Sequence, residues 1–91
     1  MEETMKLTLL KIDLGIFSTA QDIYLTHLLS LAEKEIEREG IIPDGSAEYG
    51  GIQIQYAAYL FRRRASEETA MPRFLRYALN NLLMSQKAVT K

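Results

Sequence analysis

The stretch TAQDIYLTHLLSLAEKEIEREG, residues 19–40, decides the fold, because it has the pattern of an amphipathic helix of about five turns. At about 100° per residue, its apolar side chains share one stripe, as is typical of a helix that packs against a core. The stripe consists of Leu25, Leu28, Leu29, Ala32 and Ile36. We therefore expect a helix over about 19–39.

Both ends of this helix carry recognisable signals. Ser18 and Thr19 are good N-caps, and Gln21 or Asp22, three residues further on, completes a capping box. Gly40 suits the left-handed backbone conformation that follows a helix end. The two ends and the apolar stripe therefore predict the same element.

Two other segments have the spacing of core-facing helices. Leucines predict a short helix over about 5–13 that ends near Gly15, although an alternating pattern is also arguable there. Pro72 is favourable as the first residue of a helix, which we expect over about 72–87. Its apolar stripe consists of Leu75, Ala78, Leu79 and Leu82, flanked by Phe74 and Leu83.

The segment 47–64 is the hardest to assign. Ile52, Ile54 and Tyr56 alternate with glutamine, which is a strand pattern. The alternation fails after Tyr56, and no other segment is clearly β, so a strand would have no partner. We therefore expect a helix, with Ser46 as its N-cap, that is apolar nearly all round and lies in the middle of a bundle. The prediction is one all-α domain, residues 1–91, built as a small bundle of four or five helices.

The composition fits a single domain with a modest core. Of the 91 residues, 47% are hydrophobic and 25% are charged, which argues against a disordered chain. The absence of cysteine favours a reducing compartment over a disulfide-rich secreted domain. No run approaches the roughly 18 apolar residues of a membrane span, and the opening Met-Glu-Glu is acidic where a signal peptide is basic. We expect no membrane partner.

Charge is unevenly distributed along the chain. Residues 1–51 hold four Lys or Arg against ten Asp or Glu, a net charge of −6, whereas residues 52–91 hold seven against two, a net charge of +5. A chain polarised in this way can use opposite ends against different partners or against copies of itself. The simpler interpretation is two solvated faces of opposite sign.

No residue pattern predicts chemistry. His27 is the only histidine, and without cysteine or a second ligand at suitable spacing we expect no metal site. We interpret His27 as a half-buried packing residue. There is no G-x-S-x-G nucleophile motif and no phosphate-binding glycine loop. The sequence thus predicts neither a catalytic residue nor a cofactor, and an enzyme is not expected.

Two charged clusters are candidates for binding a partner. Glu33 and Glu37 belong to an acidic run at the end of the long helix, where the helix dipole disfavours negative charge. The run therefore serves either solubility or a basic partner. The arginines 62–64 end the next helix and point to different sides, so at least one is free for a salt bridge, a neighbouring subunit or a phosphate. Arg73 and Arg76 add a second basic face.

Two apolar residues of the long helix lie beside its main stripe. Tyr24 and Leu31 widen the apolar surface beyond a narrow seam. Together with the apolar helix over 47–64, they suggest more hydrophobic surface than one small domain needs, which indicates oligomerisation. The alternative is that the first short helix covers them.

Four blocks of the sequence, taken in order, resemble the small head–tail connector proteins of tailed bacteriophages and prophages, also called head-completion or DNA-packaging adaptor proteins. The blocks are LKIDLGI (10–16), DIYLTHLLSLAEKEIEREGI (22–41), QYAAYLFRRR (55–64) and MPRFLRYALNNL (71–82). The resemblance covers about residues 6–86. Its most specific pieces are the helix end A-x(3)-I-x(3)-G-I (Ala32, Ile36, Gly40 and Ile41), Y-A-x-Y-L-x-R-R and M-P-R-x-L-R-x-A-L-N-N.

The resemblance implies a structural role. Members of this family are helical bundles that assemble into a ring, commonly of about a dozen copies, between the portal and the tail. The ring extends the DNA channel, helps to close the filled head and docks tail-side connector proteins, and DNA passes through it without sequence-specific binding. The family implies no catalysis and no cofactor. Its location is the virion neck, after assembly in the host cytoplasm.

Ring formation needs two different complementary surfaces on each subunit. We expect the acidic end of the long helix to face arginines of the neighbouring subunit. The candidate interface residues are Tyr24, Leu31, Glu33, Glu37, Arg62, Arg63, Arg64, Arg73 and Arg76. In a competing assignment, the arginines line the channel. The alternative function is a small helical DNA-binding module of a packaging or regulatory system, which would use the basic face of the last helix and bind duplex DNA in a salt-dependent manner.

Overall fold

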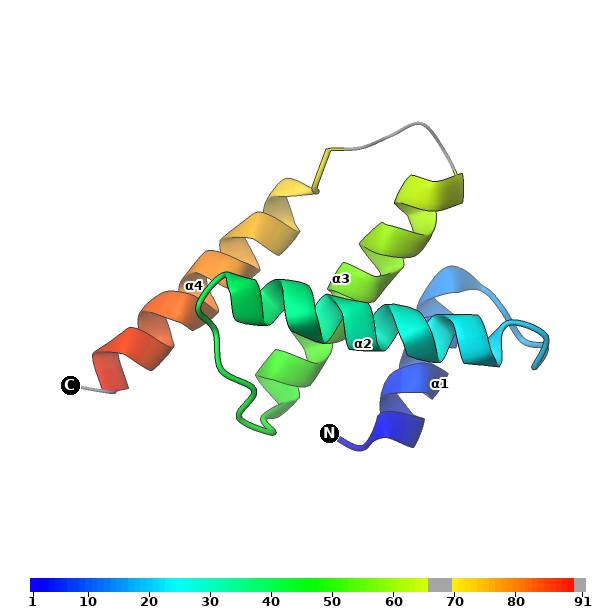
Figure 1. The fold of residues 1–91 in the computed structure, drawn as a ribbon, viewed down its shortest axis with the longest axis horizontal. Helices are drawn as coiled ribbons and strands as arrows, with labels where there is room; N and C mark the ends of the chain where they lie inside the picture. The colour runs from blue at the N-terminus through cyan, green and yellow to red at the C-terminus, as the bar shows by residue number, and fades with distance from the viewer. Residues whose placement is uncertain (66–69, 90–91) are drawn as a thin grey trace.

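The third helix lies at the centre of the structure and packs against each of the other three. The computed structural model describes residues 1–65 and 70–89, with α1 at Glu3–Leu14, α2 at Asp22–Arg38, α3 at Ala47–Ala65 and α4 at Arg73–Val89. α2 crosses over α3, while α1 and α4 lie on opposite sides of it (Figure 1). The described residues contain four helices and no strand, which confirms the all-α prediction, and they show no fifth helix.

The apolar stripe predicted over residues 19–40 forms one side of the core. All five of its members are buried: Leu25, Leu28, Leu29, Ala32 and Ile36. The other side comes chiefly from α3, where Ile52, Ile54 and Tyr56 are all buried although they point to different sides of the helix. Because α3 has a neighbouring helix on several sides, an apolar surface all round is stable there. The helix prediction for this segment is confirmed, and the strand pattern was misleading.

The left-handed helix end predicted at Gly40 is present. Gly40 has φ 94°, and its N–H donates to the carbonyl of Glu37 at 2.9 Å. Ile41, the next residue, is buried in the same core cluster as Ile36. α1 ends in the same manner at Gly15, which has φ 72°. Both helices therefore stop where glycine relieves the strain of a positive φ.

The capping box predicted at the start of α2 is wrong. The helix begins only at Asp22, and Gln21, in the N-cap position, makes no capping hydrogen bond through its side chain. The carboxylate of Asp22 instead pairs with Lys11 of α1 at 2.8 Å. A contact between helices thus replaces the local cap. By contrast, Ser46 caps α3 as predicted, since its Oγ accepts the N–H of Tyr49 at 3.0 Å.

Two polar contacts join segments that are distant in the sequence. The buried amide of Gln53 donates to the carbonyl of Leu29 at 2.9 Å, where α2 crosses α3. The amide of Gln86 on α4 accepts the N–H of Ile42 at 2.8 Å and donates to its carbonyl at 2.7 Å. Gln86 thereby ties the segment between α2 and α3 to α4.

A pair of glycine substitutions tests the role of Gly40. Gly40→Ala should lower the free energy of unfolding by about 1–2 kcal/mol, because alanine is strained at a positive φ. Gly51→Ala is the matched control: Gly51 lies inside α3 with no atom close to an added Cβ, so alanine should raise stability by about 0.5–1 kcal/mol. Urea unfolding measures both. Equal effects of the two substitutions would contradict this account of the α2 end.

Candidate functional site

The described residues do not place His27 in a catalytic or metal-binding cluster. His27 is exposed on the face of α2 opposite the core stripe, so the prediction of a half-buried packing residue is wrong. Within residues 1–65 and 70–89, no three potential ligands gather closely enough to hold a metal ion. None of the described helices is long and apolar enough to cross a membrane. The candidate sites are therefore charged and apolar surfaces.

The acidic run of α2 divides into a paired and an unpaired set. Glu35 pairs with Arg38 at 3.0 Å on the same helix. Glu39 accepts two hydrogen bonds from the guanidinium of Arg76 on α4, at 3.0 and 3.2 Å. Neither Glu33 nor Glu37 forms an ion pair with any described residue. The structure thus leaves available the two glutamates that the sequence analysis singled out.

The free carboxylates lie around a buried tyrosine. Burial and, to a smaller extent, the negative charges of Glu33, Glu37 and Asp44 together raise the pKa of Tyr49 to about 12. Glu48, in the first turn of α3, adds a fourth carboxylate beside Asp44 in the sequence. We call Glu33, Glu37, Asp44 and Glu48 the acidic end of the molecule.

Each of the three arginines at the end of α3 makes a different contact. Arg62 donates to the carboxylate of Asp13 at 3.1 Å. The guanidinium of Arg63 lies 5.5 Å from the centre of the Tyr59 ring, and that of Arg64 lies 4.8 Å from the centre of the Tyr24 ring. Such stacking orients an arginine without neutralising it. Arg63 and Arg64 therefore leave their positive charge unpaired by any described carboxylate at this end of α3, whereas Arg62 is paired with Asp13.

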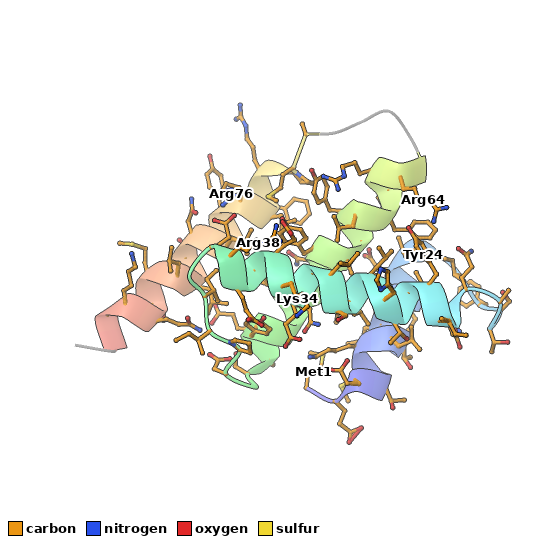
Figure 2. All side chains as sticks on the ribbon, in the orientation of Figure 1. Met1, Tyr24, Lys34, Arg38, Arg64 and Arg76 are labelled. Carbon is orange, nitrogen blue, oxygen red and sulfur yellow. The ribbon has the colours of Figure 1, made fainter. Side chains whose placement is uncertain are left out.

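Arg73 and Arg76, predicted as one basic face, have different environments. Arg76 is half-buried and paired with Glu39, so it joins α4 to the end of α2 (Figure 2). Arg73 is exposed and has no partner among the described residues. We call Arg63, Arg64 and Arg73 the basic end. α3, with 19 residues, places about 28 Å between its own two termini, so it separates the acidic end from the basic end.

Tyr24 and Leu31 also differ in their surroundings. Tyr24 packs against Phe61 with ring centres 6.3 Å apart and lies beneath Arg64 (Figure 2). With Gln21, these residues line a shallow groove of about 300 Å³. α3 therefore contributes to the cover of Tyr24, whereas Leu31 remains 39% exposed.

Two exposed apolar stripes were missed by the sequence analysis. On α1, Met5, Leu9 and Ile12 point away from the core. On α4, Phe74 and Tyr77 are each 61% exposed, and Met84 lies on the same side. The signal was present, because residues 5, 9 and 12 have helical spacing, as do Leu7, Leu10 and Leu14 of the same helix. Phe74, which the sequence analysis places at the edge of the core stripe, is instead exposed.

A groove of about 350 Å³ lies between the start of α3 and the end of α4. It is lined by Ile42, Asp44, Ser46, Glu48, Leu82, Ser85 and Gln86. The groove thus combines apolar side chains with two carboxylates of the acidic end. An apolar group flanked by positive charge would complement this lining.

Tyr49 gives the acidic end a measurable dependence on pH. Its hydroxyl has no hydrogen-bond partner among the described residues, so Tyr49→Phe should leave the stability at pH 7 unchanged or raise it. The folded-state pKa of about 12 exceeds the ordinary 10, so stability should fall as pH rises from 10 towards 12. Tyr49→Phe should lose less stability over this range. Urea unfolding at several pH values measures the effect, with exposed Tyr77→Phe as the control that keeps the full alkaline loss.

The two arginines of α4 should respond differently to substitution. Arg76→Ala should lower the free energy of unfolding by about 0.5–1 kcal/mol, because it removes a bidentate but partly exposed pair, and added salt should shrink the loss. Arg73→Ala should change stability by less than about 0.5 kcal/mol. Denaturant titration at low and high salt checks both values. An equal loss for both would argue against the division into a structural and a free arginine.

Comparison with known proteins adds no relative. No protein-family model matches the chain, and no curated protein or solved structure is significantly similar to it. The resemblance to head–tail connectors therefore stays a prediction from the sequence.

Proposed function

We propose that this protein is a structural subunit that assembles into a ring, in the manner of the head–tail connectors of tailed bacteriophages. In that role the ring lies between the portal and the tail-side proteins, extends the DNA channel and closes the filled head. Its locations are the virion neck and, during assembly, the host cytoplasm. The sequence blocks described above suggest this class, and the surfaces of the molecule support it.

The observation that carries the proposal is the separation of two charged surfaces by α3. A ring repeats one heterologous contact, which needs two different and complementary patches on each subunit. The acidic end and the basic end have opposite sign and lie at opposite ends of α3. Neither end can neutralise the other within one chain, whereas adjacent copies can bring them together.

The exposed apolar stripes support the same conclusion. α1 and α4 lie towards opposite ends of the longest dimension of the molecule, which measures 45 Å (Figure 1). Each carries three exposed apolar residues in a helical stripe. Exposed apolar residues that share one face of a helix are candidates for protein contacts. Two such patches on different sides fit a subunit that has a neighbour on each side.

The alternative, a DNA-binding module, receives less support. It would depend on the basic face of α4, and Arg76 of that face is paired with Glu39. Asn80 and exposed Arg73 remain on the solvent side. In the proposed ring, DNA passes through the channel and is not held by sequence-specific contacts.

Mass measurement over a concentration series tests the proposal. Light scattering and native mass spectrometry should show a closed oligomer that grows at the expense of monomer, and negative-stain images should show rings. Ile12→Glu should weaken assembly, because it places a charge in the α1 stripe, whereas Thr8→Glu, exposed beside that stripe, is the matched control. A protein that stays monomeric at millimolar concentration, or that binds duplex DNA with strong salt dependence, would count against a ring subunit.

A further inference from the structure

We propose that the contact between adjacent copies, in the assembly proposed above, is made by Phe74 and the basic end of one copy docking into the groove at the acidic end of the next. This inference rests on the proposed function and extends it by naming the two surfaces that meet. Its occupant is a second copy of this chain.

The groove is already shaped to receive a side chain. Leu82 and Ile42 supply its apolar surface, and Ile42 is 63% exposed. Gln86 forms hydrogen bonds with the N–H and the carbonyl of Ile42, so this wall of the groove is attached to α4 in the free protein. Its volume of about 350 Å³ falls in the range of sites that enclose a small ligand. A preformed groove lowers the ordering cost of binding.

The rim of the groove is negatively charged. Asp44 and Glu48 line it, and neither forms an ion pair with a described residue. Hydrogen bonds from Ser46 lower the pKa of Asp44, so its carboxylate stays charged at neutral pH. The amino group of Met1 donates a hydrogen bond to the carbonyl of Gly45 at 3.1 Å, and its positive charge offsets part of this negative charge. With Glu33 and Glu37 close by, the region remains acidic.

The complementary surface combines an aromatic ring with arginines. Phe74 lies in the first turn of α4 and is 61% exposed, next to exposed Arg73. Phe74 and Arg63 line a hollow of about 120 Å³ together with Tyr59. An apolar ring flanked by guanidinium groups is the complement of an apolar groove flanked by carboxylates. Buried aromatic residues and arginines are also the residues that contribute most to binding at interfaces.

One chain cannot make this contact with itself. Phe74 and the groove residues Leu82 and Gln86 lie 8 and 12 positions apart on α4, which corresponds to roughly 12–18 Å along a rigid helix. A second copy is required, and because both surfaces are on every copy the contact can repeat. Complementary surfaces on a single chain favour a second copy over an unrelated acidic or basic partner.

Charge exchange tests the pairing. Glu48→Arg and Arg73→Glu should each weaken self-association roughly tenfold or more, because each sets like charges against one another. The double variant in one chain, and an equimolar mixture of the two single variants, should recover it. Thr26→Glu, exposed on α2 and outside both charged ends, adds a negative charge away from the proposed contact and should leave assembly unchanged. Failure of both rescues would overturn the pairing.

Cross-linking detects the contact even if association is weak. The chain has no cysteine, so introduced thiols are unique. Ala70→Cys lies at the hollow beside Phe74 and Ser85→Cys lines the groove, and a short bismaleimide should join the two variants into a covalent heterodimer. Ala70→Cys with Ser30→Cys, exposed on α2, is the control pair that should stay unjoined.

The outcomes separate this inference from the proposed function. Wild-type rings with no cross-link and no effect of the charge exchanges would overturn the inference and leave the ring standing. Specific cross-links and charge rescue in a protein that forms only dimers or open filaments would support the contact and overturn the ring. A wild type that is monomeric, with no cross-link, would overturn both.

Discussion

The crossing of α2 over α3 is the contact on which the rest of the structure depends. Both helices contribute small buried residues to the core, Ala32 on α2 with Ala57 and Ala58 on α3, and small side chains let helix axes approach closely. Gln53 ties the crossing through the carbonyl of Leu29, at a buried position where a missing hydrogen bond is costly. α1 and α4 then pack on α3 from either side, so the crossing sets where all exposed surfaces lie.

The helices could be predicted from the sequence because their apolar periodicity and their glycine stops are local signals. The stripe of α2, the stop at Gly40 and the cap at Ser46 all have this origin. The predictions that failed concerned features that depend on tertiary contacts. The cap of α2 gave way to a pair between Asp22 and Lys11, and no local pattern distinguishes paired Arg76 from exposed Arg73. For the candidate surfaces, the sequence indicated which charges matter but not which of them had partners.

In this protein, the positions of the charged residues matter more than the net charge of the chain. The net charge of the chain is −1, yet among the described residues Glu33, Glu37, Asp44 and Glu48 gather near the start of α3 and Arg63, Arg64 and Arg73 near its end. Pairs such as Glu39 with Arg76 neutralise charge where helices meet inside one molecule. In the proposed assembly, the unpaired charge at the two ends keeps like ends of different copies apart and aligns unlike ends. The same charges that add little to folding can therefore orient an association.

The double hydrogen bond between Gln86 and Ile42 has a mechanical consequence. It attaches Ile42, in the segment before α3, to α4, which also carries Phe74. In the proposed assembly, the offset from one subunit to the next is then set by the rise of a single helix, which is stiff, and not by the many rotamers of long side chains. A stiff spacing of this kind would give every contact between neighbouring subunits the same rotation, and a closed ring requires the same rotation at every contact.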